Sequence, residues 1–339
     1  MLPHFLILAL SFVIILAGSE MFTNGIEWAG QRLKISEAAV GSLLAAVGTA
    51  LPETFIPAVA LLSGRKDQAA HSAVGIGAIV GAPMMLSTLA LFVMGAAAIG
   101  FRKRRKRIAM TVPPEHVRRD LGFFLPVYLL VIVLGLCNLG LFARRAGAIG
   151  LIILYGLYSI TMLRLTRAEG IELEHGLYFE RIFRGNPLAP RFRVTSIQVV
   201  AGVIAILVGA KQFVDQIVRF SHHWKLNPGV LSLILSPLAT ELPEKYNSVV
   251  WIRQSKDHLA VANITGAMVF QSCIPVAIGL AFSPWHLTPA ELLAGAVGLI
   301  STAILFINVR DGELGTPTLM VGGIAYGIFI AGLSVIGLF

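Results

Sequence analysis

The sequence predicts an all-α membrane protein with about ten transmembrane helices in two inverted five-helix repeats. Of its 339 residues, 56% are hydrophobic and 13% are charged, and the mean hydropathy is +0.80. Soluble globular domains do not have this composition. The apolar runs are long enough to cross a hydrocarbon core of about 30 Å as helices. The alternating segments of roughly ten residues that build a transmembrane barrel are absent from the sequence.

The prediction of two halves rests on a short motif that occurs twice, 191 residues apart. Residues 49–53 read Thr-Ala-Leu-Pro-Glu, and residues 240–244 read Thr-Glu-Leu-Pro-Glu. The same offset continues into the apolar runs on both sides, which indicates two homologous halves. Equivalent residues outside the motif include Gly18 with Gly209 and Gly75 with Gly266.

Each long apolar run is interpreted as one membrane span. Five spans separate equivalent points of the two halves, and because five is odd the second half crosses the membrane in the opposite sense. We expect a first repeat at 1–164, a cytoplasmic linker at 165–193 and a second, inverted repeat at 194–339. The predicted spans are residues 5–30, 37–63, 71–100, 121–139, 147–164, 195–219, 229–251, 258–282, 289–309 and 316–338.

Orientation follows from the positions of Lys and Arg. Of the 27 basic residues, 19 lie in one alternating set of loops, 6 lie in the other set and 2 lie inside spans. The positive-inside rule places the loops with 19 basic residues in the cytoplasm, so both termini are expected outside an inner, cytoplasmic membrane. No basic segment precedes the first span, so a cleaved signal peptide is not expected.

Two cytoplasmic segments carry most of this charge. Residues 102–107 read Arg-Lys-Arg-Arg-Lys-Arg, and the run is interpreted as an anchor that sets topology, with recognition of anionic lipid headgroups as the alternative. The linker at 165–193 mixes acidic and basic residues. It is interpreted as a solvated connection, with a regulatory ion site as the alternative.

Several functions are disfavoured. The formal charge of +9 does not indicate nucleic acid binding, because the basic residues lie mostly in loops. Cys137 and Cys273 both lie in apolar runs, which argues against a disulfide framework or a thiolate metal cluster. A zinc-protease His-Glu-x-x-His motif and a recognisable hydrolase spacing are absent, so we expect neither an enzyme nor a bound cofactor.

The second and seventh predicted spans are interrupted by proline. Pro52 and Pro57 lie in one, and Pro237 and Pro243 lie in the other. A proline removes a backbone donor and frees a carbonyl one turn earlier, so each break exposes carbonyl oxygens at membrane depth. These include carbonyls near Thr49 and Thr240. Carbonyl oxygens beside a carboxylate suit a hard cation that needs several oxygen ligands.

Each interrupted span also contains a glutamate directly after its motif proline, Glu53 in one and Glu244 in the other. Across a pseudo-two-fold axis we expect these carboxylates to face each other, where they would repel in low dielectric. A divalent cation removes the conflict, and protons can replace it when it leaves. The alternative is that both are protonated structural residues that cap the broken helices; their symmetric placement favours the functional interpretation.

These motifs resemble the alpha-repeats of the calcium/cation antiporter superfamily, which contains the sodium/calcium and proton/calcium exchangers. The family pattern is Gly-Thr-Ser-x-Pro-Glu, followed about nineteen residues later by Gly-Asn-x-x-Gly-Ser. Residues 48–53 read Gly-Thr-Ala-Leu-Pro-Glu, residues 239–244 read Ala-Thr-Glu-Leu-Pro-Glu and residues 262–267 read Ala-Asn-Ile-Thr-Gly-Ala. The resemblance covers nearly the whole chain. It implies calcium ligation by Glu53 and Glu244 with carbonyls of Thr49 and Thr240.

The chain departs from the family pattern where serine, asparagine or aspartate oxygens serve sodium. These departures leave two interpretations open: coupling to protons through Glu53, Glu241 and Glu244, or a changed, asymmetric substrate site. The replaced positions are Ala50, Glu241, Ile76, Ala267, Val80 and Gln271.

Three residues near the second glutamate have alternative roles. Glu241, three residues before Glu244, is either a third carboxylate of the site or a residue turned to a water-filled vestibule. Lys245 is expected to extend toward the interface rather than to pair. Asn263 is either a ligand or a polar contact between helices. The candidate cation site comprises Glu53, Glu244, Thr49, Thr240, Glu241, Gln271, Asn263 and Ala50.

The predicted function is a secondary antiporter that exchanges Ca²⁺ or another divalent cation for H⁺ or Na⁺ by alternating access. The alternatives are a cation channel or uniporter, and an antiporter fold with a changed substrate. The expected partners are inorganic cations and the lipid bilayer, the expected oligomeric state is a monomer, and nucleic acid is not expected to bind.

Overall fold

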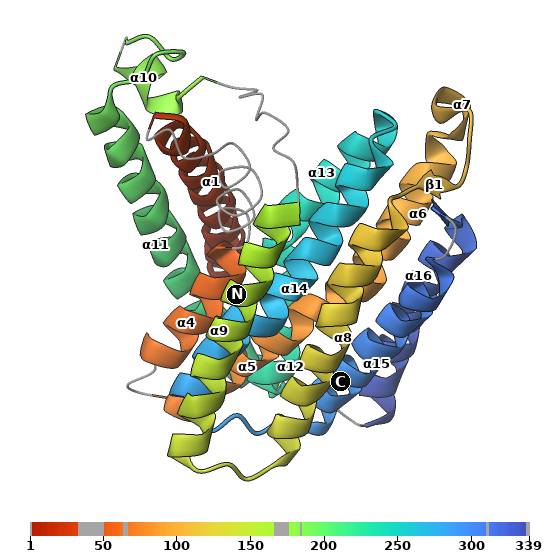
Figure 1. The fold of residues 1–339 in the computed structure, drawn as a ribbon. Coiled ribbons are helices and arrows are strands. Elements are labelled where there is room, and N and C mark those ends of the chain that lie inside the picture. The colour runs from red at the N-terminus through yellow and green to blue at the C-terminus, as the bar shows by residue number, and fades with distance from the viewer. Residues whose placement is uncertain are drawn as a thin grey trace.

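The computed structural model describes residues 2–32, 51–63, 67–165, 176–183, 185–309 and 312–336. Its elements follow the predicted spans closely, and the predicted all-α class is confirmed (Figure 1). The helices and strands are α1 Leu2–Arg32, α4 Leu51–Ser63, α5 Gln68–Met85, η2 Leu86–Ala90, α6 Leu91–Gly100, α7 Arg102–Arg105, β1 Met110–Thr111, α8 Pro114–Leu136, α9 Leu141–Leu165, α10 Tyr178–Ile182, α11 Phe192–Trp224, α12 Pro228–Thr240, α13 Leu242–Arg253, α14 Asp257–Phe282, α15 Pro289–Asn308, β2 Glu313–Leu314 and α16 Thr316–Val335.

Eight helical segments in the described ranges are long and apolar enough to cross a membrane. Two further apolar helices, α4 and α12, have only 13 residues each and belong to the interrupted spans. The third span is a continuous helical stretch in which the π-turn η2 joins α5 to α6. The fourth helix, α8, begins at Pro114 rather than near residue 121, because a proline is well tolerated in the first helical turn.

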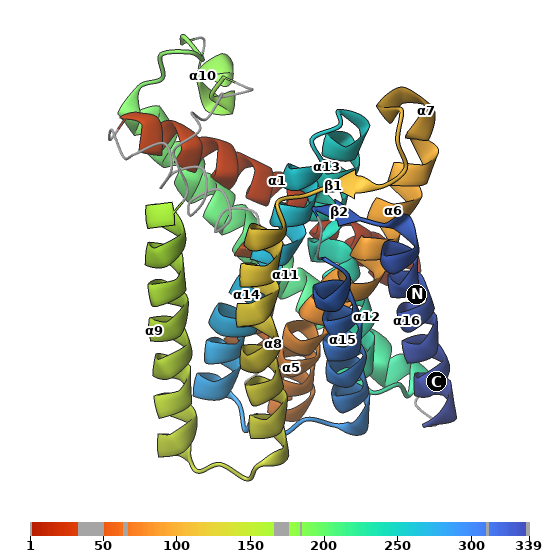
Figure 2. The same ribbon diagram turned by 45° about the vertical axis from the view of Figure 1, so that its right-hand side comes forward.

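The first helix of each half packs against the other. α1 and α11 run antiparallel over most of their length, and Phe5 at the start of α1 stacks near Phe220 at the end of α11, with ring centroids 4.7 Å apart. Gly18 lies directly against the Gly202 backbone, which brings the helix axes close together. The pair is tilted relative to the other helices (Figures 1 and 2). Equivalent helices of the two halves thus run in opposite directions, as an inverted repeat requires.

The centre of the molecule is formed by α4, α5, α12, α13 and α14. α5 and α12 are in especially close contact. Gly77 and Gly81, one turn apart on α5, lie against the carbonyl oxygens of Gly229 and Leu233 on α12. A Cβ atom at either glycine would overlap these oxygens, so glycine is required for the close approach.

The remaining long helices, α6, α8, α9, α15 and α16, surround this centre. Hydrogen bonds from aromatic side chains to backbone carbonyls fix their packing: Tyr128 Oη of α8 donates to Val80 O at 3.1 Å, and Trp285 Nε1 donates to Val131 O at 3.2 Å. The outer surfaces of these helices expose large apolar side chains such as Phe142 and Ile153. An apolar outer surface is appropriate for contact with lipid.

The segments with most basic residues gather at one end of the molecule. α7, β1, β2 and α10 all lie at the upper end in both views (Figures 1 and 2). β1 and β2 form a two-stranded antiparallel sheet, with Met110 opposite Leu314. Arg105 of the basic run is buried and contacts Asp257 at 2.6 Å. One member of the run is therefore a structural residue that joins the two halves.

Candidate cation site

The two motif glutamates occupy equivalent positions in two equivalent helices. α4 begins at Leu51 and α13 begins at Leu242, which preserves the offset of 191 residues. Pro52 and Pro243 are the second residues of these helices, where the absent proline N–H costs no intrahelical bond. Glu53 and Glu244 follow as third residues. The free N–H groups and the positive end of the helix dipole favour a carboxylate there.

Both glutamates are removed from solvent and lie near each other. Glu53 is 5% exposed and Glu244 is 2% exposed. Glu53 is within electrostatic range of Glu244 and of Glu241, and Thr240 lies beside its carboxyl group. Among the described residues, neither carboxylate oxygen of Glu53 has a hydrogen-bond partner. Buried carboxylates with unused acceptor capacity are suited to bind a cation.

The helix break of the second half is a single residue. α12 ends at Thr240 and α13 begins at Leu242, so Glu241 lies between them, with φ −92° and ψ 11°. Proline at 243 cannot donate to a carbonyl four residues earlier, which leaves acceptor capacity at the end of α12. The predicted break is therefore present in this half.

Glu241 and Lys245 lie together inside the molecule, and the expectation that Lys245 extends to the interface was wrong. Glu241 is fully buried rather than turned to a water-filled vestibule. Lys245 is 6% exposed, and its Nζ donates to Glu241 Oε2 at 3.0 Å instead of extending to the interface. The cause is the low dielectric, because an unpaired ammonium at this depth would be costly. The spacing of four residues along a helix was the sequence signal for this pair.

Gln271 and Asn263 reach the site from α14. Gln271 is 1% exposed and lies beside Glu241, with no hydrogen-bond partner for its Oε1 among the described residues. Asn263 Nδ2 donates to Glu244 O at 3.2 Å and to Ser248 Oγ at 3.4 Å. Asn263 thus connects α14 to α13, while the Gln271 side chain places its amide beside Glu241.

Thr49 and Ala50, the remaining predicted site residues, lie outside the described ranges. Within those ranges, no three His, Cys, Asp or Glu side chains are grouped closely enough to hold a metal ion. The described side chains contribute two glutamates near each other and a third glutamate that is paired with a lysine.

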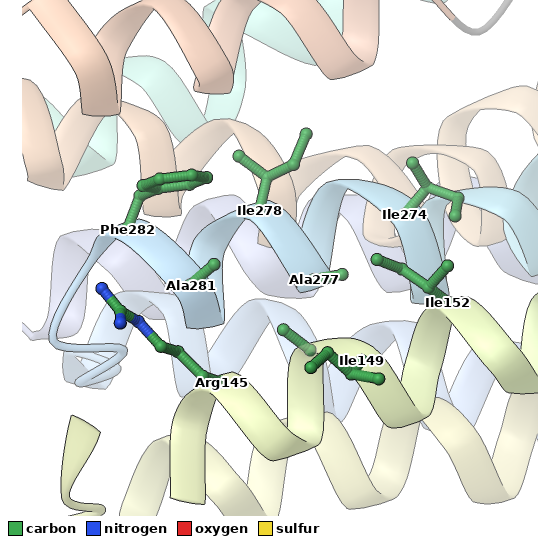
Figure 3. A pocket seen from close by; sticks show the side chains of 9 residues that line it. Arg145, Ile149, Ile152, Ile274, Ala277, Ile278, Ala281 and Phe282 are labelled. Atoms are coloured by element: carbon green, nitrogen blue, oxygen red, sulfur yellow. The ribbon is translucent and has the colours of Figure 1, made fainter. Parts of the chain in front are cut away.

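A cavity lies at the side of the molecule, between α9 and α14 (Figure 3). It has a volume of about 530 Å³, and its walls are apolar apart from Arg145 at one end. Ile149 and Ile152 of its α9 wall are more than half exposed. None of the predicted site residues that the structure describes lines this cavity, so it is a lateral surface groove separate from the buried glutamates.

Asp120 is one of several buried carboxylates that hydropathy does not single out. Asp120 of α8 is 5% exposed and accepts hydrogen bonds from Tyr158 Oη at 2.6 Å and from Thr265 Oγ1 at 2.5 Å. The apolar run predicts a span that begins at 121, which leaves Asp120 just outside it. The pair of prolines at 113 and 114 was the signal that the helix begins earlier. Asp120 joins α8, α9 and α14.

Comparison with known proteins agrees with this architecture. Residues 3–164 and 195–336 match the family described as sodium/calcium exchanger protein. CaxA of Alkalimonas amylolytica, named as a candidate antiporter, is 24% identical over 318 residues that cover 93% of this chain and 92% of CaxA.

Two solved structures share the fold. The crystal structure of the H⁺/Ca²⁺ exchanger CAX has a TM-score of 0.75 and 16% identity, covering 97% of this chain and 81% of that one. A structure of the sodium-calcium exchanger NCX_Mj has a TM-score of 0.60 and 20% identity, covering 98% and 99%. These exchangers have ten-helix inverted repeats. The chain therefore belongs to the sodium/calcium exchanger family, whose members transport inorganic cations across membranes.

Proposed function

We propose that this protein is a secondary antiporter that exchanges a divalent cation, Ca²⁺ first among the candidates, for protons or sodium. The observation that carries the proposal is the pair Glu53 and Glu244. They occupy the same position in α4 and α13, they are buried, and they lie within electrostatic range of each other. The family assignment supports a transporter of inorganic cations.

The chemistry of exchange follows from two nearby carboxylates in low dielectric. Their mutual repulsion requires compensation by positive charge. One divalent cation supplies it, and two protons or two monovalent cations supply the same charge. The divalent cation and the monovalent ions exclude each other because they bind the same carboxylate oxygens of Glu53 and Glu244. Backbone carbonyls at the helix breaks, the Gln271 amide and Thr240 would complete the coordination of a hard cation.

The choice of counter-ion is proposed from the side chains around the site. Val80, the first-half equivalent of Gln271, has no side-chain oxygen, and its carbonyl accepts a hydrogen bond from Tyr128. Ile76 and Ala267 also lack side-chain oxygens. Sodium needs several oxygen ligands, whereas a proton needs one titratable group. Proton coupling is therefore proposed over sodium coupling.

Alternating access is proposed to use the α1–α11 pair. This pair packs against itself more extensively than against α4, α5 and α12. Glycines bring the two helices together, so they can move as one body past the centre that holds the glutamates. Movement of a repeat pair around a fixed midplane site is the general mode of such transporters.

The test uses purified protein in proteoliposomes loaded with a calcium indicator. Glu53→Gln and Glu244→Gln are each expected to abolish Ca²⁺ uptake driven by an imposed proton gradient, because each removes one of the two charges that hold the cation. Glu115→Gln, at an exposed position of α8, is the control and should transport normally. Uptake that survives both substitutions would refute the proposal.

The same vesicles separate exchange from the alternatives. Uptake that requires a counter-gradient indicates an antiporter, whereas uptake that follows the Ca²⁺ gradient alone indicates a channel or uniporter. Sodium and proton gradients are imposed in turn. Strong, saturable uptake driven by sodium would contradict the proposed proton coupling.

A further inference from the structure

The ion pair between Glu241 and Lys245 occurs in only one half of the repeat. The first-half equivalents of these residues are Ala50 and Thr54, at the same offset of 191 residues. One half thus has a carboxylate and an ammonium where the other has a methyl group and a hydroxyl. The two charged residues occur together, four residues apart, in a motif that is otherwise shared.

This pair lies inside the cation site rather than at its edge. The side chain of Glu241 is 0% exposed and that of Lys245 is 7% exposed. Glu241 is also within electrostatic range of Glu53, beside Gln271 and close to Glu244. The Lys245 ammonium therefore binds Oε2 of Glu241, a carboxylate that water does not reach.

The charges explain what this arrangement does. Glu53, Glu241 and Glu244 carry three formal negative charges, and Lys245 reduces the total to −2. A site with a charge of −2 matches one divalent cation. Without the lysine, the same residues would carry −3 and would attract an additional monovalent cation to Glu241.

We propose that Lys245 is a tethered counter-cation that occupies Glu241 and thereby excludes an additional soluble monovalent cation from that carboxylate. This role rests on the proposed antiport function and deepens it: Lys245 limits the load of the site to the two positive charges that Glu53 and Glu244 require. The lysine acts through Glu241 and is a specificity-determining residue rather than a ligand of the cargo.

A purely mechanical role predicts something different. If the pair only pins the start of α13 to the helix break, removal of either residue loosens the fold, and sodium has no special effect on the variants. A counter-cation role predicts instead that soluble sodium replaces the lost ammonium. The two roles are separated by the response to sodium, not by the loss of activity.

The experiment uses three variants that copy the first half: Lys245→Thr, Glu241→Ala and the double variant. Their expected site charges are −3, −1 and −2. Each purified protein is tested for Ca²⁺ uptake in proteoliposomes and for thermal stability in detergent. Sodium chloride is titrated against choline chloride in both assays, because a cation that binds only the folded protein raises its melting temperature.

Lys245→Thr is expected to gain a sodium-dependent rise in melting temperature that the wild type lacks. Its Ca²⁺ uptake should be inhibited at sodium concentrations about tenfold lower than in the wild type, since sodium competes at the vacated carboxylate. Glu241→Ala should weaken the apparent Ca²⁺ affinity by about tenfold or more, because the Lys245 ammonium then has no carboxylate partner and repels the cation. The double variant should transport better than Glu241→Ala alone and show no sodium-dependent stabilisation.

The proposal is overturned if Lys245→Thr responds to sodium no more than the wild type does, or if the double variant is no better than Glu241→Ala. Should Lys245→Thr fail to fold, the comparison of the double variant with Glu241→Ala decides, and Lys245→Arg serves as a variant that keeps the charge. If no protein, wild type included, transports Ca²⁺, the proposed function fails, while the sodium-dependent melting temperatures still test Lys245.

Discussion

Two buried basic side chains of the described residues each have a carboxylate partner. Lys245 pairs with Glu241, and Arg105 pairs with Asp257. Both basic residues are less than one-tenth exposed. An isolated charge would be costly at these positions, whereas a paired and hydrogen-bonded charge is tolerated. The two buried basic residues are therefore tolerated inside the molecule because each one is paired with a carboxylate.

Asp67, directly before the start of α5, is a charged residue nearer the surface that also has polar partners. Its Oδ1 accepts a hydrogen bond from Ala70 N at 3.3 Å, and its Oδ2 lies 2.8 Å from His222 Nε2 of α11. The pKa of Asp67 lies below its usual value. The main cause is the hydrogen bond from His222, and the second is the hydrogen bond from the Ala70 amide. The residue thus caps α5 and contacts the α1–α11 pair.

A pH dependence follows from this lowered pKa. Because the pKa of Asp67 is lower in the folded state than its unfolded value of about 3.9, its contribution to stability is present above that value. It is lost as the pH falls through the folded-state pKa. Asp67→Asn should therefore lower the melting temperature at pH 6 and converge with the wild type in strong acid. Parallel melting curves across the acid range would contradict this expectation.

At the scale of the helices, the contact between α5 and α12 requires small residues. Gly77 and Gly81 face carbonyl oxygens of α12, and Pro237 of α12 also lies close to Gly81. The two helices belong to different halves, and α12 ends directly before the break at Glu241. Their separation therefore affects the position of α13 as well as the packing of the centre.

Gly81→Ala is expected to destabilise the protein and to reduce transport. The new methyl group would overlap the Leu233 carbonyl oxygen and approach the Pro237 ring, so the two helices would have to separate. Overpacking of this kind costs about 1–3 kcal/mol. Thermal unfolding in detergent measures the effect. Gly150→Ala is the control, because nothing lies within 4 Å of the added Cβ in α9, and alanine favours a helix.

At the scale of the whole molecule, the two halves are connected at the end that carries the basic loops. Arg105 donates to Asp257 Oδ2 at 2.6 Å, Arg107 donates to the same oxygen at 3.0 Å, and the Thr111 amide adds a third bond at 3.0 Å. The sheet of β1 and β2 lies beside this cluster. The basic run therefore combines exposed charge with one buried structural arginine.

Asp257→Asn should weaken this connection between the halves. Arg105 would remain buried without a compensating charge, and loss of one partner of a buried pair typically costs about 3–5 kcal/mol. A lower melting temperature in detergent is the expected result. Arg104→Gln, in the same run but exposed, should leave the melting temperature unchanged. Equal melting temperatures for Asp257→Asn and the wild type would show that the connection is not stabilising.

Much of the fold was predictable from the sequence because membrane spans are long, apolar and bounded by loops. The repeat offset placed Glu53 and Glu244 at the same position of two helices, and the structure keeps that register from Leu51 and Leu242 onward. Boundaries were less predictable. The start of α8 at Pro114 depended on a capping signal rather than on hydropathy, and this concealed the buried Asp120.

The sequence by itself determined the helical class, the two related halves and which glutamates occupy equivalent places in them. Only the tertiary structure decided the partners of the charged groups: Lys245 with Glu241, Arg105 with Asp257, and Asp120 with Tyr158 and Thr265. The physical reason is that hydropathy and periodicity report how a segment partitions between lipid and water. The energy of a buried charge depends instead on the groups that packing brings within hydrogen-bond distance.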